Sequence, residues 1–116
     1  MQKIGIIIPT YNEEENIASL VDKIKSYIPD IEIFVIDDSI KNLSEKILEN
    51  KKLVYYFHRG KKLGRGTAVI FGLEQALKNK SIDILIEMDA DFSHNPGELN
   101  NKLNFFVKNK LDMLIA

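Results

Sequence analysis

The feature that most constrains the fold is a series of short apolar runs that alternate with segments of helical periodicity. Ile, Val, Leu, Phe and Met fill residues 4–8, 31–36 and 84–88 almost without interruption, and two further runs cover 53–57 and 111–115. Strands buried on both faces are continuously apolar, whereas strands with one face in water alternate between apolar and polar residues. The runs therefore predict five strands of a mostly parallel sheet.

The segments between the runs predict helices that cover this sheet. A capping box, in which Asn12 caps the helix and Glu15 reaches back, precedes a first apolar stripe of Ile17, Leu20, Val21, Ile24 and Ile28. A weaker helix is expected near residues 43–48. Two more stripes are Val69, Leu73, Ala76 and Leu77, beside Gly72 for close packing, and, after Pro96, Leu99, Leu103, Phe106 and Val107. The alternation gives an α/β fold, here a three-layer α/β/α sandwich with right-handed crossovers.

Length and charge limit the classes of function. The 116 residues predict a single domain over residues 1–116, truncated at its C-terminal end relative to folds of this kind. The formal net charge of −1 provides no general attraction to nucleic acid, so no nucleic-acid partner is expected. No apolar stretch approaches the roughly 20 residues that cross a bilayer. We therefore expect a cytoplasmic chain, with peripheral contact at the cytoplasmic face of a membrane left open.

Polar residues follow three of the predicted strands directly, and the ligands of such sheets bind beyond the carboxyl ends of the strands. The most specific segment contains Asp89 and Asp91, two positions apart after a buried strand. Two carboxylates so close repel each other unless a cation joins them, and hard ions such as Mg²⁺ or Mn²⁺ suit them. Alternatively, Asp89 ends the strand and Asp91 begins a turn. The pair alone leaves both interpretations open.

Two other strand ends are also open to two interpretations. Asp38 follows the strand at 31–36, where it either forms a turn or accepts hydrogen bonds from a nucleobase. The segment from Pro9 to Glu13 either caps a helix or forms, through its backbone, Tyr11 and Glu13, the wall of a nucleotide site. Helix capping does not account for an aromatic residue at the end of a strand.

A basic, glycine-rich loop from His58 to Thr67 precedes the second long helix. It holds four of the sixteen Lys and Arg residues. It is neither a Walker A loop nor a G-x-G-x-x-G loop, because the required residues are missing. A solvated basic loop is one interpretation. The other is that Lys62 and Arg65 act near a diphosphate or order the site, since helix N-termini attract anions.

Together the four segments resemble glycosyltransferase family 2, and within it the dolichyl-phosphate mannose synthase and polyprenyl-phosphate glycosyltransferase branch, which has a GT-A fold. The resemblance covers nearly the whole chain, in order and spacing. The matching segments are Ile8-Pro9-Thr10-Tyr11-Asn12-Glu13, Val35-Ile36-Asp37-Asp38-Ser39, Arg59 with Lys62-Leu63-Gly64-Arg65-Gly66-Thr67-Ala68, and Met88-Asp89-Ala90-Asp91-Phe92-Ser93-His94-Asn95-Pro96.

The resemblance implies an inverting glycosyltransferase that transfers a hexose to a polyprenyl phosphate. The donor would be GDP-mannose or UDP-glucose, and Mg²⁺ or Mn²⁺ would be bound by Asp89 and Asp91, with Asp91 as principal metal ligand and catalytic residue. Ser93 stands where some relatives have a glutamine ligand. The implied nucleotide-sugar residues, with those of the basic loop, are Pro9, Thr10, Tyr11, Glu13, Ile36, Asp38, Lys62, Arg65, Asp89, Ala90 and Asp91.

Two departures from the family pattern leave other functions open. The segment after Asp38 is shorter than usual, and the chain ends before the Gly-Ser-Arg element and the acceptor-binding part. One alternative is a phosphoacceptor receiver domain, with Asp37 and Asp38 as its acidic pair and Asp89 as the phosphorylated residue. Another is a fragment that binds a nucleotide sugar without catalysing transfer.

Overall fold

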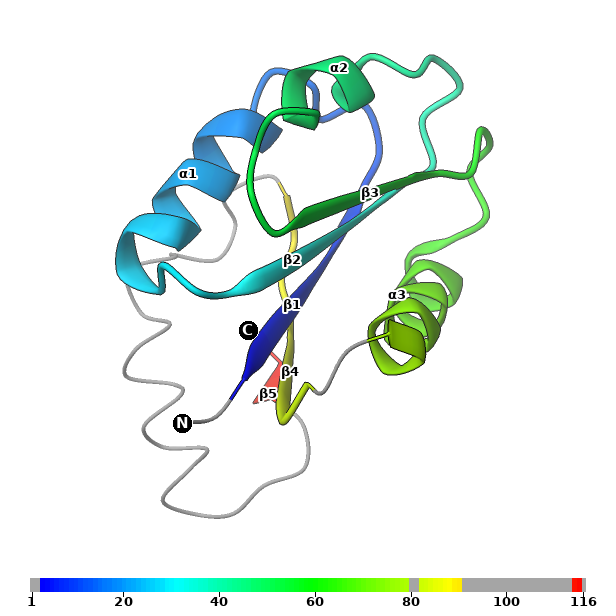
Figure 1. Cartoon of the computed structure of the whole chain (residues 1–116). Helices are drawn as coiled ribbons and strands as arrows, with labels where there is room; N and C mark the ends of the chain where they lie inside the picture. The colour runs from blue at the N-terminus through cyan, green and yellow to red at the C-terminus, as the bar shows by residue number, and fades with distance from the viewer. Residues whose placement is uncertain (1–2, 80–81, 91–113, 116) are drawn as a thin grey trace.

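A five-stranded parallel sheet forms the centre of the molecule in the computed structural model, which describes residues 3–79, 82–90 and 114–115. The sheet order is β3-β2-β1-β4-β5, and every neighbouring pair is parallel (Figure 1). All five predicted strands are confirmed. Their bounds are β1 (Ile4–Thr10), β2 (Glu32–Asp37), β3 (Val54–His58), β4 (Ile84–Glu87) and β5 (Leu114–Ile115).

This strand order excludes the receiver interpretation. Receiver domains have the order β2-β1-β3-β4-β5, whereas the chain here runs outward from β1 to β3 and then returns to the other side of β1 with β4. The order therefore reverses between β1 and β4. Ligands of open α/β sheets bind beyond the carboxyl ends of the strands at such a reversal.

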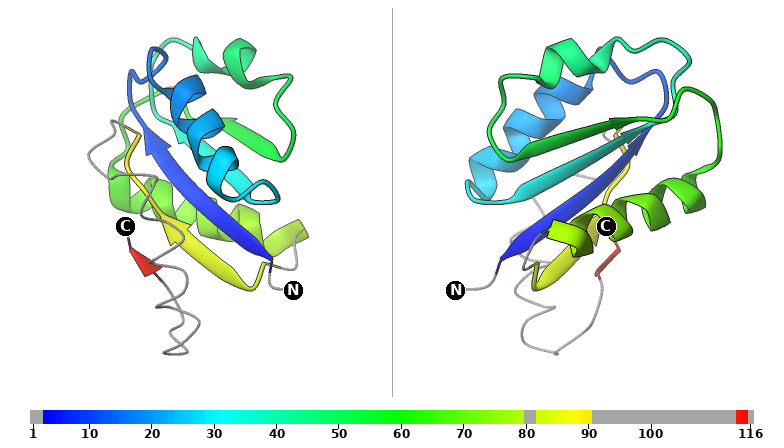
Figure 2. Two further views of the ribbon diagram at one scale, coloured as in Figure 1. Left: turned by 90° about the vertical axis from the view of Figure 1, so that its left-hand side faces the viewer. Right: turned by 45° about the vertical axis from the view of Figure 1, so that its right-hand side comes forward.

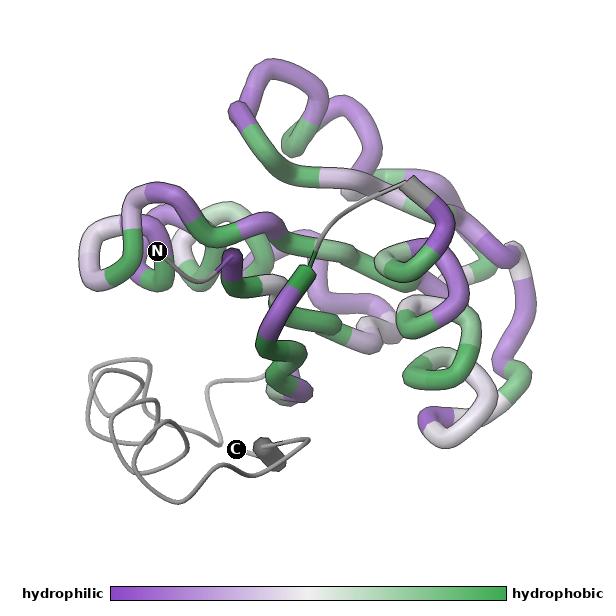
Figure 3. Tube along the Cα trace, turned by 60° about the horizontal axis from the view of Figure 1, so that its bottom comes forward, coloured by the Kyte–Doolittle hydropathy of each residue, from purple (hydrophilic) through white to green (hydrophobic). Residues whose placement is uncertain are grey.

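Helices cover both faces of the sheet, which confirms the predicted α/β/α layers. Figure 2 shows α1 (Ile17–Tyr27) and α2 (Ser44–Leu48) on one face and α3 (Arg65–Asn79) on the other. The hydrophobic residues follow the strands and the inner sides of the helices, while the connecting loops are mostly hydrophilic (Figure 3). Among the described residues, no helix combines the length and apolarity needed to cross a membrane.

Alternate residues of each central strand enter different cores. In β1, Ile6 and Ile8 pack toward α1, while Ile7 packs toward α3. In β2 the side chains alternate in the same way, with Val35 toward α1 and Ile36 toward α3. Because neither face is left in water, polar side chains are restricted to the ends of the strands.

The predicted capping box is wrong. Helix α1 begins at Ile17 with Asn16 at the N-cap, and no side chain caps it. Asn12 instead has a φ of 56°, and its backbone N–H donates to Ser39 Oγ at 2.7 Å. This bond to the end of β2 keeps the segment before α1 at the edge of the sheet, so Glu15 lies in a turn rather than in the helix.

Helix α3 packs closely on the sheet through small residues. Ala68 and Ala76 are buried, and Gly72 lies against Ile7, as the sequence predicted. Leu77 was expected in the same stripe, but it is 63% exposed, because the face that approaches the sheet is centred on the small residues. The helix expected after Pro96 lies outside the described residues.

Gly72 and Gly66, both in α3, provide a matched test of this packing. A Cβ at Gly72 would lie 2.6 Å from Cγ2 of the fully buried Ile7, whereas a Cβ at Gly66 would meet nothing within 4 Å. Overpacking costs about 1–3 kcal/mol and the gain in helix propensity offsets up to about 1 kcal/mol. Urea denaturation should therefore show Gly72→Ala lowering the free energy of unfolding by about 1–2 kcal/mol.

Gly66→Ala should leave the free energy of unfolding unchanged or raise it by up to about 1 kcal/mol. Equal stability of the two variants would contradict close packing of α3 at Gly72.

Candidate functional site

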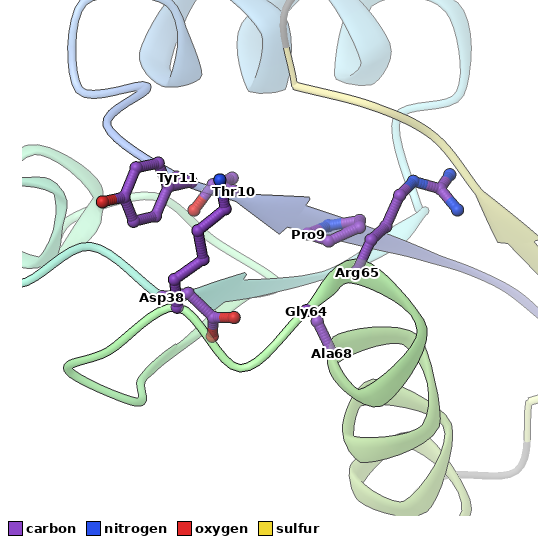
Figure 4. Close-up of a pocket in the computed structure, with 8 residues that line it drawn as sticks. Pro9, Thr10, Tyr11, Asp38, Gly64, Arg65 and Ala68 are labelled. Carbon is purple, nitrogen blue, oxygen red and sulfur yellow. The ribbon is translucent and has the colours of Figure 1, made fainter.

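A pocket of about 190 Å³ lies at the carboxyl ends of β1 and β2, beside the start of α3 (Figure 4). Six residues of the predicted nucleotide-sugar site line it, and they come from three separate segments of the chain. Gly64 and Ala68 also line it, and sequence reasoning gave these two no contact role. The lining residues are Pro9, Thr10, Tyr11, Asp38, Lys62, Gly64, Arg65 and Ala68.

Asp38 fastens the basic loop to the end of β2. Its carboxylate accepts two hydrogen bonds from Arg59, at 2.5 Å from Nε and 2.8 Å from a terminal nitrogen, and a third from the Leu63 N–H at 3.1 Å. Burial acts to raise the pKa of Asp38, but the hydrogen bonds from Arg59 and the loop backbone outweigh it and lower the pKa below 3.8. Asp38 is therefore a buried anion that holds the loop in place.

Arg59 is a residue to which sequence reasoning assigned no role. Besides Asp38, its guanidinium donates to Thr67 Oγ1 at 3.1 Å and to the Gly64 carbonyl at 3.3 Å, so it joins the loop to the first turn of α3. It stands 21 positions from Asp38, and only the parallel pairing of β2 with β3 brings the two together. The available signals were the clustering of four cations in the loop and the place of Arg59 in the family pattern.

Two glycines give the loop its shape. Gly60 and Gly64 have φ values of 80° and 102°, in the left-handed region that disfavours other residues. They flank Lys61, Lys62 and Leu63. The chain therefore turns at both ends of this short segment, and the Leu63 N–H is directed at Asp38.

The carboxylate of Asp37, next to Asp38, is buried and forms hydrogen bonds with neighbouring protein groups. Asp37 is 1% exposed and accepts hydrogen bonds from the backbone and hydroxyl of Ser39 and from the Tyr56 hydroxyl. Burial, followed by the hydrogen bond to Asp37, raises the pKa of Tyr56, which keeps the phenol a proton donor. The two adjacent aspartates thus have different tasks, since Asp37 orders the strand end and Asp38 lines the pocket.

The pocket is also lined by an aromatic ring, that of Tyr11, and by a buried hydroxyl, that of Thr10. Tyr11 is 38% exposed, and Lys62 Nζ lies 4.9 Å from the centre of its ring, within cation–π range. Thr10 Oγ1 is buried and has no hydrogen-bond partner within the described part of the chain. Figure 4 shows Thr10 and Tyr11 on the same side of the pocket.

Glu13 and Ile36 do not line the pocket. The Glu13 carboxylate accepts a hydrogen bond from Asn16 Nδ2 at 2.9 Å, and its carbonyl accepts the Ile17 N–H at 2.9 Å. Ile36 is fully buried against α3. Their predicted contacts with a nucleoside stay predictions.

Arg65, the first residue of α3, connects that helix to the end of β4. Its Nε donates to Asp89 Oδ1 at 2.7 Å and a terminal nitrogen donates to Glu87 Oε1 at 2.5 Å. Hydrogen bonds to Glu87 and then Asp89 raise the pKa of Arg65, so the guanidinium stays charged. Sequence reasoning did not single out Glu87, because a carboxylate inside an apolar strand gives no indication of which cation it meets.

Among the described residues, the carboxylates beside the pocket provide only some of the ligands that a hard divalent cation requires. Asp89 is one-third exposed at the carboxyl end of β4, and Ala90 is buried beside it. No group of three or more His, Cys, Asp or Glu side chains converges in the region the structure describes. Asp91 and Ser93 lie outside it. Carboxylate oxygens are nevertheless the ligands that Mg²⁺ and Mn²⁺ prefer.

The sequence matches the family described as Glycosyl transferase family 2 over residues 5–116. It is 36% identical over 108 residues to polyprenol monophosphomannose synthase of Mycolicibacterium smegmatis, and 38% identical over 119 residues to dolichol-phosphate mannosyltransferase of Pyrococcus furiosus. The alignments cover 89% and 98% of this chain, but 40% and 32% of those proteins. Undecaprenyl-phosphate mannosyltransferase of Micrococcus luteus is 34% identical, with 84% of this chain and 41% of that protein covered. The chain thus spans well under half the length of these curated relatives.

The Asp38–Arg59 pair has a stability test with a defined pH dependence. Asp38→Asn should lower the free energy of unfolding by about 3 kcal/mol at pH 7, since it leaves the Arg59 guanidinium buried without an anion. A carboxylate whose pKa is lowered by folding stabilises above its unfolded-state value, and that stabilisation is lost as the pH falls through the lower folded-state pKa. The difference between the two proteins should therefore begin to narrow below about pH 4 and close only below the folded-state pKa of Asp38.

Asp22→Asn is the matched control, because Asp22 pairs with Lys51 at the surface and its side chain is 64% exposed. It should change the free energy of unfolding by less than about 1 kcal/mol. A pH-independent gap between wild type and Asp38→Asn would contradict the buried-anion assignment.

Proposed function

The chain belongs to glycosyl transferase family 2, and from this premise we propose that its pocket binds the nucleotide-sugar donor of a polyprenyl-phosphate hexosyltransferase. The observation that carries the proposal is the pocket at the carboxyl ends of β1 and β2, next to the reversal of strand order. Six residues of the predicted nucleotide-sugar site meet there from three segments. The names of the three relatives favour mannose as the transferred sugar. The donor in this proposal is GDP-mannose.

In this proposal, different pocket residues contact different parts of the donor. The partly exposed ring of Tyr11 would offer a stacking surface for the base, and the buried Thr10 hydroxyl would gain a hydrogen-bond partner from the nucleoside. Lys62 in the basic loop and Arg65 at the start of α3 face the diphosphate, where the helix N-terminus adds its own attraction for anions. Asp38 acts through the loop it anchors.

Asp89 and Asp91 would hold the Mg²⁺ or Mn²⁺ ion, with Asp91 as the principal ligand. When bound, the ion supplies neutralisation of the charge that develops on the departing nucleoside diphosphate. Asp89 is at the edge of the pocket through its bond to Arg65. This bond supports the assignment of the diphosphate to the space between the start of α3 and the end of β4.

The acceptor in this proposal is a polyprenyl phosphate, because two of the three relatives are named as mannosyltransferases of such a lipid phosphate. An oxygen of that phosphate would form the new bond to the anomeric carbon while the bond to the nucleoside diphosphate breaks on the opposite face, which inverts the configuration. A phosphate is already anionic at neutral pH, so the attack needs no base from the protein. A membrane-bound acceptor would also bring the chain to a membrane surface.

Calorimetry with GDP-mannose, in the presence and absence of Mn²⁺, tests the donor and metal assignments together. Wild type should bind the donor in a metal-dependent manner, and Asp91→Ala should weaken that binding at least about tenfold because a charged ligand is lost. Asp22→Ala removes an equally charged but remote side chain from α1 and should bind as wild type does. Equal binding with and without metal would overturn the metal assignment, and UDP-glucose as a second donor distinguishes the base.

Tyr11 has its own test, because a second tyrosine is almost equally exposed outside the pocket. Tyr11→Ala should weaken GDP-mannose binding by about 1–3 kcal/mol, the usual contribution of a base stacked on an aromatic ring. Tyr27→Ala, at the end of α1 with 41% exposure against 38% for Tyr11, should leave binding unchanged. Equal effects of the two substitutions would exclude stacking on Tyr11.

Transfer itself requires a separate assay with a polyprenyl phosphate. Formation of the glycosylated lipid phosphate by the 116-residue chain would support the full reaction. Donor binding without transfer would instead support the interpretation of a donor-binding piece that lacks the acceptor side.

A further inference from the structure

One guanidinium joins two carboxylates at the edge of the donor pocket. Arg65 donates to Glu87 Oε1 and to Asp89 Oδ1. Glu87 is the last residue of β4 and Asp89 follows two positions later, and the carboxylates of both reach the same guanidinium. Two anions held so close need a cation between them, and here the protein supplies one itself.

The two ion pairs differ in their access to water. The Glu87 side chain is 8% exposed, whereas Asp89 is 34% and Arg65 is 47% exposed. Removal of Arg65 from Glu87 would leave a buried carboxylate without its cation, which is costly. The Arg65–Glu87 ion pair is therefore the permanent one. The pair with Asp89 faces solvent, where exchange of one cation for another costs little.

The oxygen that Arg65 binds is therefore one that a metal ion would need. We propose that Arg65 is a built-in competitor of the divalent cation: its guanidinium neutralises Asp89 before the ion binds, and binding of the ion shifts Arg65 onto Glu87 alone. This inference rests on the proposed function, in which Asp89 is a metal ligand. Glu87 is then the anchor that keeps the released guanidinium at the pocket.

The exchange would couple metal binding to donor binding. Arg65 lines the pocket and precedes the rest of α3, so a guanidinium freed from Asp89 has an unused donor nitrogen beside the diphosphate position. A diphosphate that accepts this donor favours the exchanged state, and the metal favours the same state. By linkage, each should raise the affinity for the other.

Loss of Arg65 could also change metal affinity through its charge alone, without direct competition for Asp89. Matched variants of this chain separate direct competition from such a long-range charge effect. Arg65→Gln removes the charge and both ion pairs. Lys61→Gln removes one charge from the same loop at an exposed residue with no carboxylate partner among the contacts described. Arg65→Lys keeps the charge but replaces the planar fork that reaches two carboxylates at once.

The experiment is a titration of each protein with Mn²⁺ alone, in which electron paramagnetic resonance measures the free ion and circular dichroism verifies folding. Arg65→Gln should bind Mn²⁺ about two- to fivefold more tightly than wild type, because an exposed competing ion pair is lost. Arg65→Lys should fall between the two, and Lys61→Gln should match wild type. Binding by Arg65→Gln where wild type binds none would also support the competition.

Other results would overturn the proposal. They are equal or weaker binding by Arg65→Gln, equal tightening by Lys61→Gln, wild-type affinity in Arg65→Lys, and the absence of binding in all four proteins. Because no nucleotide sugar is present, failure here is distinct from failure of the donor assignment, which the GDP-mannose titration reports.

A measurement on wild type alone removes any dependence on the folding of variants. The Nε–H of Arg65, identified as the nitrogen-15 signal missing from Arg65→Lys, should shift when Mg²⁺ is added, because its bond to Asp89 is the one replaced. The Arg59 Nε–H, bound to the buried Asp38, is the internal control and should not move. A Mg²⁺-bound protein with an unchanged Arg65 signal would contradict the exchange.

Discussion

Burial of the sheet on both faces is the constraint on which the rest of the molecule depends. Ile6, Ile7 and Ile8 are all fully buried although consecutive side chains point to opposite faces. Polar groups can then lie only where the strands end. The carboxyl ends of β1, β2 and β4 carry Thr10, Asp38 and the Glu87–Asp89 pair respectively, and the packing of the core thereby gathers the chemistry along one edge.

The strands, and the segments that contain the site, could be predicted from sequence because burial leaves a local signature. Apolar runs, three of them nearly continuous, located all five strands, and the strand-end rule located the pocket that includes Tyr11, Asp38 and Lys62. The start of α1 was wrong because a capping box is a local pattern. The Asn12 N–H was taken by Ser39, 27 positions away, and no local pattern predicts that bond.

The ion pairs of the site could not be predicted for the same reason. Arg59 and Arg65 are close in sequence and similar in type, yet one binds the end of β2 and the other binds the end of β4. Which arginine meets which carboxylate depends on the crossover from β3 through α3. Leu77 illustrates the opposite error: periodicity placed it in the core, but close approach at Gly72 turns the small residues of α3 toward the sheet.

The turns at Gly60 and Gly64 give the basic loop a property useful to a protein engineer. Both ends of the three-residue segment between them are fixed, since Arg59 is bound to Asp38 on one side and Thr67 bonds back to the Gly64 carbonyl on the other. Lys61 and Lys62 between these ends are exposed and contribute nothing to either core. The side chains at positions 61 and 62 can therefore be varied in a library to alter the ligand preference of the pocket, while the stability of the fold is kept.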